Sequence, residues 1–311
     1  MAKFRLFILL TFFLTACAPA TATQPPASPS PTVDLPSPVD ANKLGDTTVS
    51  PADGVVLVYI PAGEFIMGDD HGMTDEQPAH SVHLDAFWLD RTEVTNEAYH
   101  QCVEAGACDV PSDTSYFDDA AYANHPVVFV SWRDAVSYCS FVGKRLPTEA
   151  EWEKAATWNP LTNEKYQFPW GDDYDCSKAN FDDETELDDS LMQGGHAACD
   201  GFVRSAPVGS FPQGASPYGA LDMAGNVWEW VRDAFIETDP FSFQEFKNYY
   251  AISPYKNPQG VDPSITEYRS MRGGSWNWTF GYGRSAYRLW FGLDDSYDGV
   301  GFRCAMSADG N

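Results

Sequence analysis

The sequence predicts a loop-rich α+β domain. Helical periodicity appears only in short pieces, which argues against a helical bundle or a doubly wound sheet. The 311 residues include 24 Gly and 22 Pro, so much of the chain is expected to be loop. With 10 Trp, 15 Tyr and 20 Phe it has enough apolar area for a large core. No internal repeat is visible, and residues 53–308 fit within the size range of one domain.

The N-terminus has the pattern of an export signal. Lys3 and Arg5 precede the apolar run 6–14, which is too short to span a bilayer as a helix. Residues 14–17, Leu-Thr-Ala-Cys, resemble a bacterial lipobox, in which Cys17 becomes the lipidated first residue. We therefore expect a lipoprotein signal peptide over 1–17. The protein would lie in the cell envelope, at the outer membrane or cell surface, because Ala18 does not resemble the aspartate that often retains such proteins at the inner membrane.

Residues 18–52 are rich in Pro, Ser, Thr and Ala and predict a disordered tether. The net charge of −26 argues against nucleic-acid binding and against electrostatic docking on anionic lipid. Membrane contact is thus expected through the lipid anchor only. The acidic run 182–189 is typical of a solvated loop, although its place beside a candidate metal site leaves a cation-binding alternative open.

The first predicted elements are strands. Residues 55–68 indicate two strands around a Pro-Ala-Gly turn at 61–63. Residues 81–89 alternate apolar and polar side chains as a half-buried strand does. His80 and His83 lie near its start, but without a third convergent ligand they are interpreted as ordinary strand residues.

Three helices follow. Thr95 can cap a helix that runs to about Glu104. Residues 131–142 predict a second helix, capped by Ser131 and closed by Gly143 in a left-handed conformation. Thr148 opens a third, with Glu151 placed to complete a capping box.

Residues 218–230, Tyr-Gly-Ala-Leu-Asp-Met-Ala-Gly-Asn-Val-Trp-Glu-Trp, have two interpretations. One is a helix start, with Asp222 or Asn226 as the cap. The other is a calcium site, because Ca²⁺ favours mixed carboxylate and carbonyl ligands around a bent backbone. The ligands would be the side chains of Asp222 and Glu229 and the carbonyls of Gly225 and Val227.

This stretch closely resembles the signature of the formylglycine-generating enzyme (sulfatase-modifying factor) family. Other blocks resembling that family occur in its order and cover nearly all of the chain after the tether. They are HPVVFVSW (125–132), KRLPTEAEWE (144–153), PWG (169–171), RGGSW (272–276) and GFRC (301–304). The resemblance implies a loop-rich α+β domain related to the C-type-lectin-like fold, with two small antiparallel sheets, a few helices and metal-stabilised loops.

The resemblance also implies two structural Ca²⁺ sites. The second is the site at 222–229. The first would use the side chains of Asn180 and Asp200 and the carbonyls of Phe181 and Phe202.

Seven Cys are present, and without Cys17 six remain, an even number suited to an oxidising compartment. Fifteen pairings of six are possible. The resemblance implies a long-range disulfide between Cys139 and Cys304. Cys102 and Cys108 are close enough in sequence to cross-link a single turn. The remaining two, Cys176 and Cys199, are then expected to pair with each other.

Active members of the family hold Cu(I) between two thiolates, which are soft ligands suited to that ion, and convert a substrate cysteine to formylglycine. The thiolates lie six and eleven residues beyond the Arg of the Arg-Gly-Gly-Ser motif. Counting from Arg272 gives Trp278 and Gly283, neither of which has a thiol. Copper and formylglycine chemistry are therefore not expected. No phosphate-binding Gly loop or Gly-x-Ser-x-Gly elbow is present, and the six His are too scattered for the iron site of the related sulfoxide synthases.

In the family, the region of residues 276–291 lines the groove that accepts substrate peptide. Trp and Arg are favoured at binding hot spots, although a half-buried strand with core aromatics is the alternative. Our first hypothesis is a lipid-anchored module that binds a peptide, protein or small ligand. The alternatives are a formylglycine-generating oxidoreductase acting on exported sulfatases and an accessory subunit of an envelope enzyme complex. The predicted groove residues are Trp276, Trp278, Tyr282, Arg284 and Arg288.

Overall fold

The computed structural model describes residues 44–182, 200–236 and 249–308. The signal peptide, Cys17 and most of the predicted tether lie outside these ranges. The described helices are α1 (Asn96–Glu104), α2 (Trp132–Phe141) and α3 (Glu149–Thr157), with 3-10 turns η1 (Thr74–Glu76), η2 (Ala120–Tyr122), η3 (Cys176–Lys178), η4 (Pro212–Gly214), η5 (Tyr249–Ala251) and η6 (Phe280–Gly283). The described strands are β1 (Thr47–Val49), β2 (Val56–Ile60), β3 (Gly63–Met67), β4 (His80–Leu84), β5 (Phe87–Asp90), β6 (Trp158–Asn159), β7 (Glu164–Lys165), β8 (Trp228–Ala234), β9 (Tyr268–Arg272), β10 (Leu289–Gly292), β11 (Val300–Phe302) and β12 (Ala305–Ser307).

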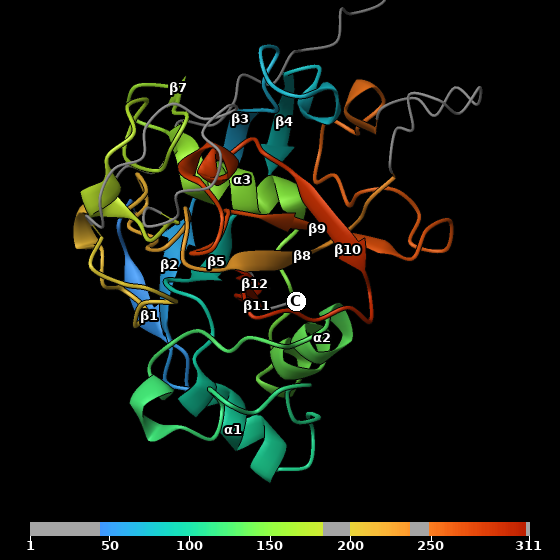
Figure 1. Ribbon diagram of the computed structural model, residues 1–311. Coiled ribbons are helices and arrows are strands. Elements are labelled where there is room, and N and C mark those ends of the chain that lie inside the picture. The colour runs from blue at the N-terminus through green and yellow to red at the C-terminus, as the bar shows by residue number, and fades with distance from the viewer. Residues whose placement is uncertain (1–43, 183–199, 237–248, 309–311) are drawn as a thin grey trace, which may run out of the picture. The chain divides into compact units, whose positions relative to one another are not determined.

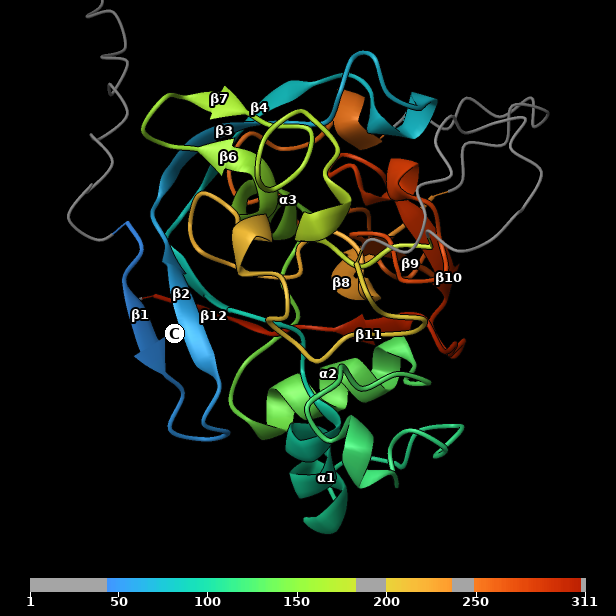
Figure 2. The ribbon, with the colours of Figure 1, turned by 60° about the vertical axis from the view of Figure 1, so that its left-hand side comes forward.

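The described strands form two four-stranded sheets, β1-β2-β5-β12 and β10-β9-β8-β11, and two small hairpins, β3-β4 and β6-β7 (Figures 1 and 2). The α+β class is confirmed. The expected antiparallel sheets are present, with one parallel pair among the described strands, β11 with β8. Since β10 also runs parallel to β8, the connection 293–299 must return the chain to the other end of the sheet.

The strand predictions hold with two corrections. The expected strand over 81–89 is two strands in different sheets, because the chain leaves β4 at Asp85, whose N–H donates to the Asn257 side chain (2.9 Å). The tether was expected to reach residue 52, but residues 47–49 already pair with β2 as β1.

The helix predictions are confirmed at their caps. The Thr95 hydroxyl accepts from the Ala98 N–H, and Ser131 and Thr148 each form a complete capping box. Gly143 has φ +71°, the left-handed conformation expected after α2. In both ribbon views α1 and α2 lie together at one end of the described structure, below the sheet that contains β8.

Helix α3 is unusual because every one of its residues is buried, although its sequence, EAEWEKAAT, is largely polar. It packs against β3, β8 and β9 (Figure 1). Its carboxylates are paired: Glu153 binds Arg272 and Lys165, and Glu149 binds Arg288. Burial alone would raise the pKa of Glu153, but Lys165 and Arg272 hold it below its ordinary value.

The expected disulfides Cys102–Cys108 and Cys139–Cys304 are confirmed. Cys176 is also disulfide-bonded, while its expected partner Cys199 lies outside the described residues.

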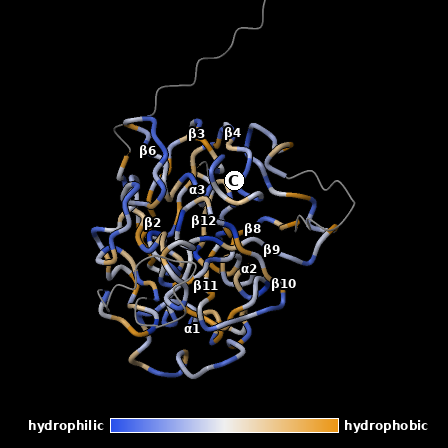
Figure 3. Tube along the Cα trace, turned by 45° about the horizontal axis from the view of Figure 1, so that its top comes forward, coloured by the Kyte–Doolittle hydropathy of each residue, from blue (hydrophilic) through white to orange (hydrophobic). Residues whose placement is uncertain are grey.

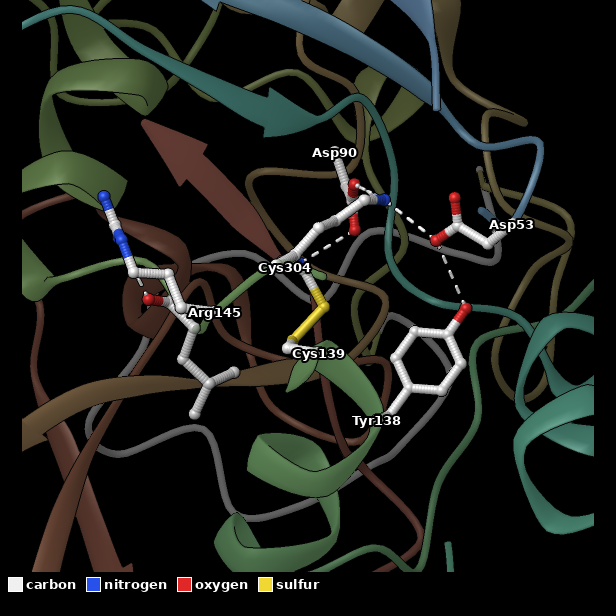
Figure 4. Close-up of a disulfide and its surroundings, with 8 residues drawn as sticks. Asp53, Asp90, Tyr138, Cys139, Arg145 and Cys304 are labelled. Carbon is white, nitrogen blue, oxygen red and sulfur yellow. Dashed lines mark hydrogen bonds and ion pairs between the residues drawn. A yellow bond between two sulfur atoms is a disulfide. The ribbon is translucent and has the colours of Figure 1, made fainter. Parts of the chain in front are cut away.

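Figure 4 shows Asp90 and Asp53 beside the Cys139–Cys304 bond. Asp90 accepts from the Cys304 N–H (2.9 Å) and pairs with Lys144 (2.7 Å), and burial raises its pKa to about 6.

Within the described ranges, hydrophobic and hydrophilic residues are interspersed along the chain (Figure 3). Accordingly, no helix within the described ranges has the length and apolar character needed to cross a bilayer.

Candidate functional site

Residues 218–227 form a loop that leads into β8, so the helix-start interpretation of this stretch is wrong. Asp222 and Asn226 have φ of 57° and 63°, which a helix does not accommodate, and Gly225 has φ 74°. A Cβ at Gly225 would also collide with the Asn180 carbonyl oxygen. The loop is tied to the Arg-Gly-Gly-Ser-Trp segment, because the Gly225 N–H donates to the Gly273 carbonyl (2.8 Å).

The residues expected at the first metal site lie together. Asp200 accepts from the Phe181 N–H (3.1 Å) and the Phe202 N–H (2.8 Å). Asn180 donates through Nδ2 to the Arg204 carbonyl (2.8 Å), while its Oδ1 is buried without a hydrogen-bond partner. A buried acceptor without a donor is costly, and a hard cation would satisfy it. The donor set therefore fits calcium.

At the second expected site, the carboxylate oxygens already accept hydrogen bonds from other parts of the protein. Both Glu229 oxygens bind Arg303 (2.6 Å each), and Oε2 also accepts from Trp152 Nε1 (2.8 Å). Asp222 accepts from the Gly209 N–H (2.6 Å). A carboxylate oxygen has more than one lone-pair site, so these contacts still leave room for a cation.

Sequence reasoning missed Glu93, a third carboxylate beside this site. It is fully buried, its Oε1 accepts from Asn226 Nδ2 (2.9 Å), and its Oε2 lacks a partner. Burial, followed by the charge of Asp222, raises its pKa well above the ordinary value. Only the presence of an acid two residues before Thr95, the N-cap of α1, could have signalled it. Within 44–182, 200–236 and 249–308, no three His, Cys, Asp or Glu side chains are arranged as a metal site.

The two positions expected to replace the thiolates lie in different surroundings. Trp278 is half-buried, edge-on to Trp228 (centroids 5.7 Å) and Tyr282 (4.7 Å). Gly283 is buried against the ring of Phe181, which a Cβ at this position would overlap. A Cβ at Gly274 would also approach that ring, to 3.0 Å. The side chain of Phe181 thus fills the space beside Gly283.

The expected groove residues divide into two groups. Trp276, Trp278 and Tyr282 are half-buried. Arg284 is also partly exposed, holds Glu76 with two hydrogen bonds (2.9 and 2.7 Å), and lines a cavity of about 720 Å³. Placing Arg288 in the groove is wrong, because it is buried and both of its charge-assisted bonds go to Glu149.

The sequence that forms these loops matches a known family. A family model described as the sulfatase-modifying factor enzyme 1-like domain matches residues 43–308. The chain belongs to this family. It is 33% identical over 340 residues to the formylglycine-generating enzyme of Streptomyces coelicolor, covering 89% of this chain and 97% of that enzyme.

Other sulfatase-modifying-factor-like relatives differ in length. The serine/threonine-protein kinase pkn1 of Chlamydia caviae is 34% identical over 268 residues, which cover 80% of this chain but only 37% of the kinase. This chain therefore spans little more than a third of that relative. Among solved structures, PvdO from Pseudomonas aeruginosa is similar with a TM-score of 0.66 and 26% identity, covering 85% of this chain and 99% of PvdO.

The packing at Gly283 predicts a specific coupling. Gly283→Ala should destabilise the protein by about 1–3 kcal/mol, because the added methyl overlaps the Phe181 ring. In a Phe181→Ala background the same change should cost much less, giving a coupling free energy of about 0.5–3 kcal/mol in a double-mutant cycle. Denaturant unfolding of the four proteins measures it. Gly292→Ala, whose Cβ would meet only the Asp295 side chain, is the control and should combine additively with Phe181→Ala. Additive costs at Gly283 would contradict the packing described.

Proposed function

We propose that this protein is an extracytoplasmic, lipid-anchored binding module that does not form formylglycine. The packing of Phe181 against Gly283 carries the proposal. Two thiolates are needed to hold Cu(I), and Trp278 and Gly283 supply none. The ring of Phe181 also leaves no space for a side chain at 283. The thiolates are therefore missing at both positions, and at Gly283 the room for a side chain is missing as well.

A binding role is supported by the aromatic surface that remains. Trp278, Tyr282 and Trp276 are half-buried on one irregular segment around η6. Partly exposed aromatic side chains held by edge-on contacts lose little conformational freedom on binding and are favoured at hot spots. The ligand would be a peptide, a protein or a small molecule that packs against these rings.

The alternative function is formylglycine generation on exported sulfatases. It is supported by the Streptomyces coelicolor relative, which this chain matches over nearly the whole enzyme. Cys304, the nearest Cys in sequence to these positions, is bonded to Cys139 and cannot serve as a copper ligand without losing that disulfide.

We also propose that Ca²⁺ occupies the two predicted sites and orders their loops. The partnerless Asn180 Oδ1 supports the first site, and the buried Asp222 and Glu93 carboxylates support the second. The bound ion would compensate negative charge and satisfy oxygens that the protein leaves without donors.

The catalytic alternative is tested directly. Incubation with a Cys-x-Pro-x-Arg peptide, copper and a reductant should leave the peptide mass unchanged, because no thiolate pair is present to hold the metal. Mass spectrometry detects the aldehyde, and the Streptomyces coelicolor enzyme serves as the positive control. Formation of aldehyde by this protein would overturn the proposal.

The binding role is tested at Trp278. Because the ring is only half-buried, Trp278→Ala should cost less stability than the roughly 3–5 kcal/mol typical of a core Trp. It should weaken binding of peptides selected from a random library by about 2 kcal/mol or more, as hot-spot truncations do. Phe141→Ala, at an exposed aromatic of α2, is the control and should leave binding unchanged. A core-sized loss of stability with unaltered peptide binding would contradict a groove at Trp278.

Calcium binding is tested by thermal unfolding. A chelator should lower the melting temperature and added Ca²⁺ should restore it, because a ligand of the folded state stabilises by mass action, by about 2.7 kcal/mol at a hundredfold excess over Kd. Asn180→Ala should reduce the restored shift, whereas Asn163→Ala, at an exposed turn, should not. An unchanged melting temperature on chelation would rule the sites out.

A further inference from the structure

Three loop segments that are distant in sequence border the cavity of about 720 Å³ beside Arg284. They lie within residues 68–79, 165–172 and 284–286. Among the described residues, the lining includes Arg284 but none of the three aromatic residues of the predicted groove. In both ribbon views β3, β4 and β7, which adjoin the first two segments, lie at the end of the domain away from α1 and α2 (Figures 1 and 2). The cavity is therefore a surface distinct from the rings around η6.

Ion pairs with buried acids fix the walls of this cavity. Arg284 donates two hydrogen bonds to Glu76, whose side chain has no exposed surface. Lys165 donates to Glu153 (2.7 Å), which is also fully buried, and to the Gly68 carbonyl. The first segment is thus tied to each of the other two, and the cavity is preorganised.

Two exposed aspartates on the lining share one arrangement. Oδ1 of Asp70 accepts from the Ala79 N–H (2.8 Å), and Oδ1 of Asp172 accepts from the Gln167 N–H (2.9 Å). Within the part of the chain that the structure describes, the Oδ2 atoms of Asp70 and Asp172 accept no hydrogen bond and form no ion pair. Each carboxylate is therefore oriented by the backbone and keeps one acceptor oxygen for a ligand.

Hydrogen-bond donors line the same cavity. The carboxamide of Gln167 has no partner among the described residues, and the ammonium group of Lys165 uses only two of its three hydrogens there. Tyr166 is half-buried, and its hydroxyl accepts from Asn159 Nδ2 (2.8 Å). The lining thus combines free acceptors, free donors and one fixed aromatic side chain.

This lining defines the chemistry of a ligand. Asp70 and Asp172 have no cation partner among the described residues, so they oppose the approach of an anion. An apolar ligand would cover their free oxygens without supplying donors, which is costly. A hydroxyl group avoids both problems, because it donates to a carboxylate in a short, charge-assisted hydrogen bond and accepts from an amide or ammonium group.

We propose that this cavity is a binding site for a neutral sugar, whose hydroxyl groups donate to Asp70 and Asp172 and accept from Gln167 and Lys165. A sugar ring presents many hydroxyl groups together with an apolar face that packs on an aromatic side chain such as Tyr166. The cavity volume falls in the range of small-molecule sites, about 300–1,000 Å³. This inference goes beyond the proposed function, because it adds a second site with its own class of ligand.

Isosteric variants test the two acceptors. Asn in place of Asp keeps Oδ1 for the backbone N–H and replaces the free oxygen by an NH₂ donor. We expect saturation-transfer NMR of the full chain to detect binding of at least one neutral disaccharide from a set of cellobiose, lactose, maltose and trehalose. Its affinity should fall about tenfold or more in Asp70→Asn and in Asp172→Asn, because each variant loses a hydrogen bond to a charged group.

Matched controls separate the cavity from general effects of charge. Asp262→Asn removes the same charge from an exposed aspartate whose Oδ1 also accepts a backbone N–H, that of Ser264 (2.9 Å), and should leave binding unchanged. Trp278→Ala, in the predicted groove, should also leave sugar binding unchanged. The uronic acid analogue of the bound disaccharide carries a carboxylate and should bind about tenfold more weakly, because Asp70 and Asp172 repel it.

Three results would overturn the inference: no binding of any disaccharide in the set, equal binding by both Asn variants and the unaltered protein, or binding of an amino-sugar analogue without binding of the neutral sugars. The last result would identify a site for cations. Thermal unfolding verifies that the variants are folded. If they are not, Gln167→Ala, which keeps the backbone N–H that orients Asp172, should show the same loss of affinity.

Discussion

The rest of the structure depends on the ion pairs that allow the polar helix α3 to be buried. Its carboxylates cannot enter the interior unpaired, because an isolated buried charge is very costly. Glu153 is therefore bound to Arg272, and Glu149 to Arg288, both in or beside the β10-β9-β8-β11 sheet. Removing one partner of such a pair costs about 3–5 kcal/mol, since the other charge remains buried. These pairs fix the helix against the sheet in one position.

The same pairs position the candidate groove. Arg272 ends β9 immediately before the Gly-Gly-Ser-Trp segment, and its guanidinium also donates to the carbonyls of Ser285, Ala286 and Tyr287. One buried side chain thus holds both ends of the loop that contains Trp278 and Gly283. These hydrogen bonds hold the loop's conformation without thiolates or a bound metal at positions 278 and 283. A shared fold can therefore persist while the chemistry at the site changes, which is why family membership alone does not establish activity here.

The sequence predicted those features that are determined locally. The caps at Thr95, Ser131 and Thr148 depend on residues three positions apart, so they could be read from the chain alone. The burial of α3 could not, because its polar composition indicates an exposed helix and its partners lie far away in sequence. The packing of Phe181 on Gly283 and the pairing of Arg288 with Glu149 join segments about 100 to 140 residues apart. Resemblance supplied the residues of these loops, but only the three-dimensional arrangement showed which of them remain available to a ligand.

The distribution of charge links the interior to the surface. Six of the 19 Lys and Arg residues are buried in the described part of the chain, among them Arg272, Arg288 and Arg303, which neutralise buried carboxylates. Cations that serve inside the protein are not available to balance the acidic surface.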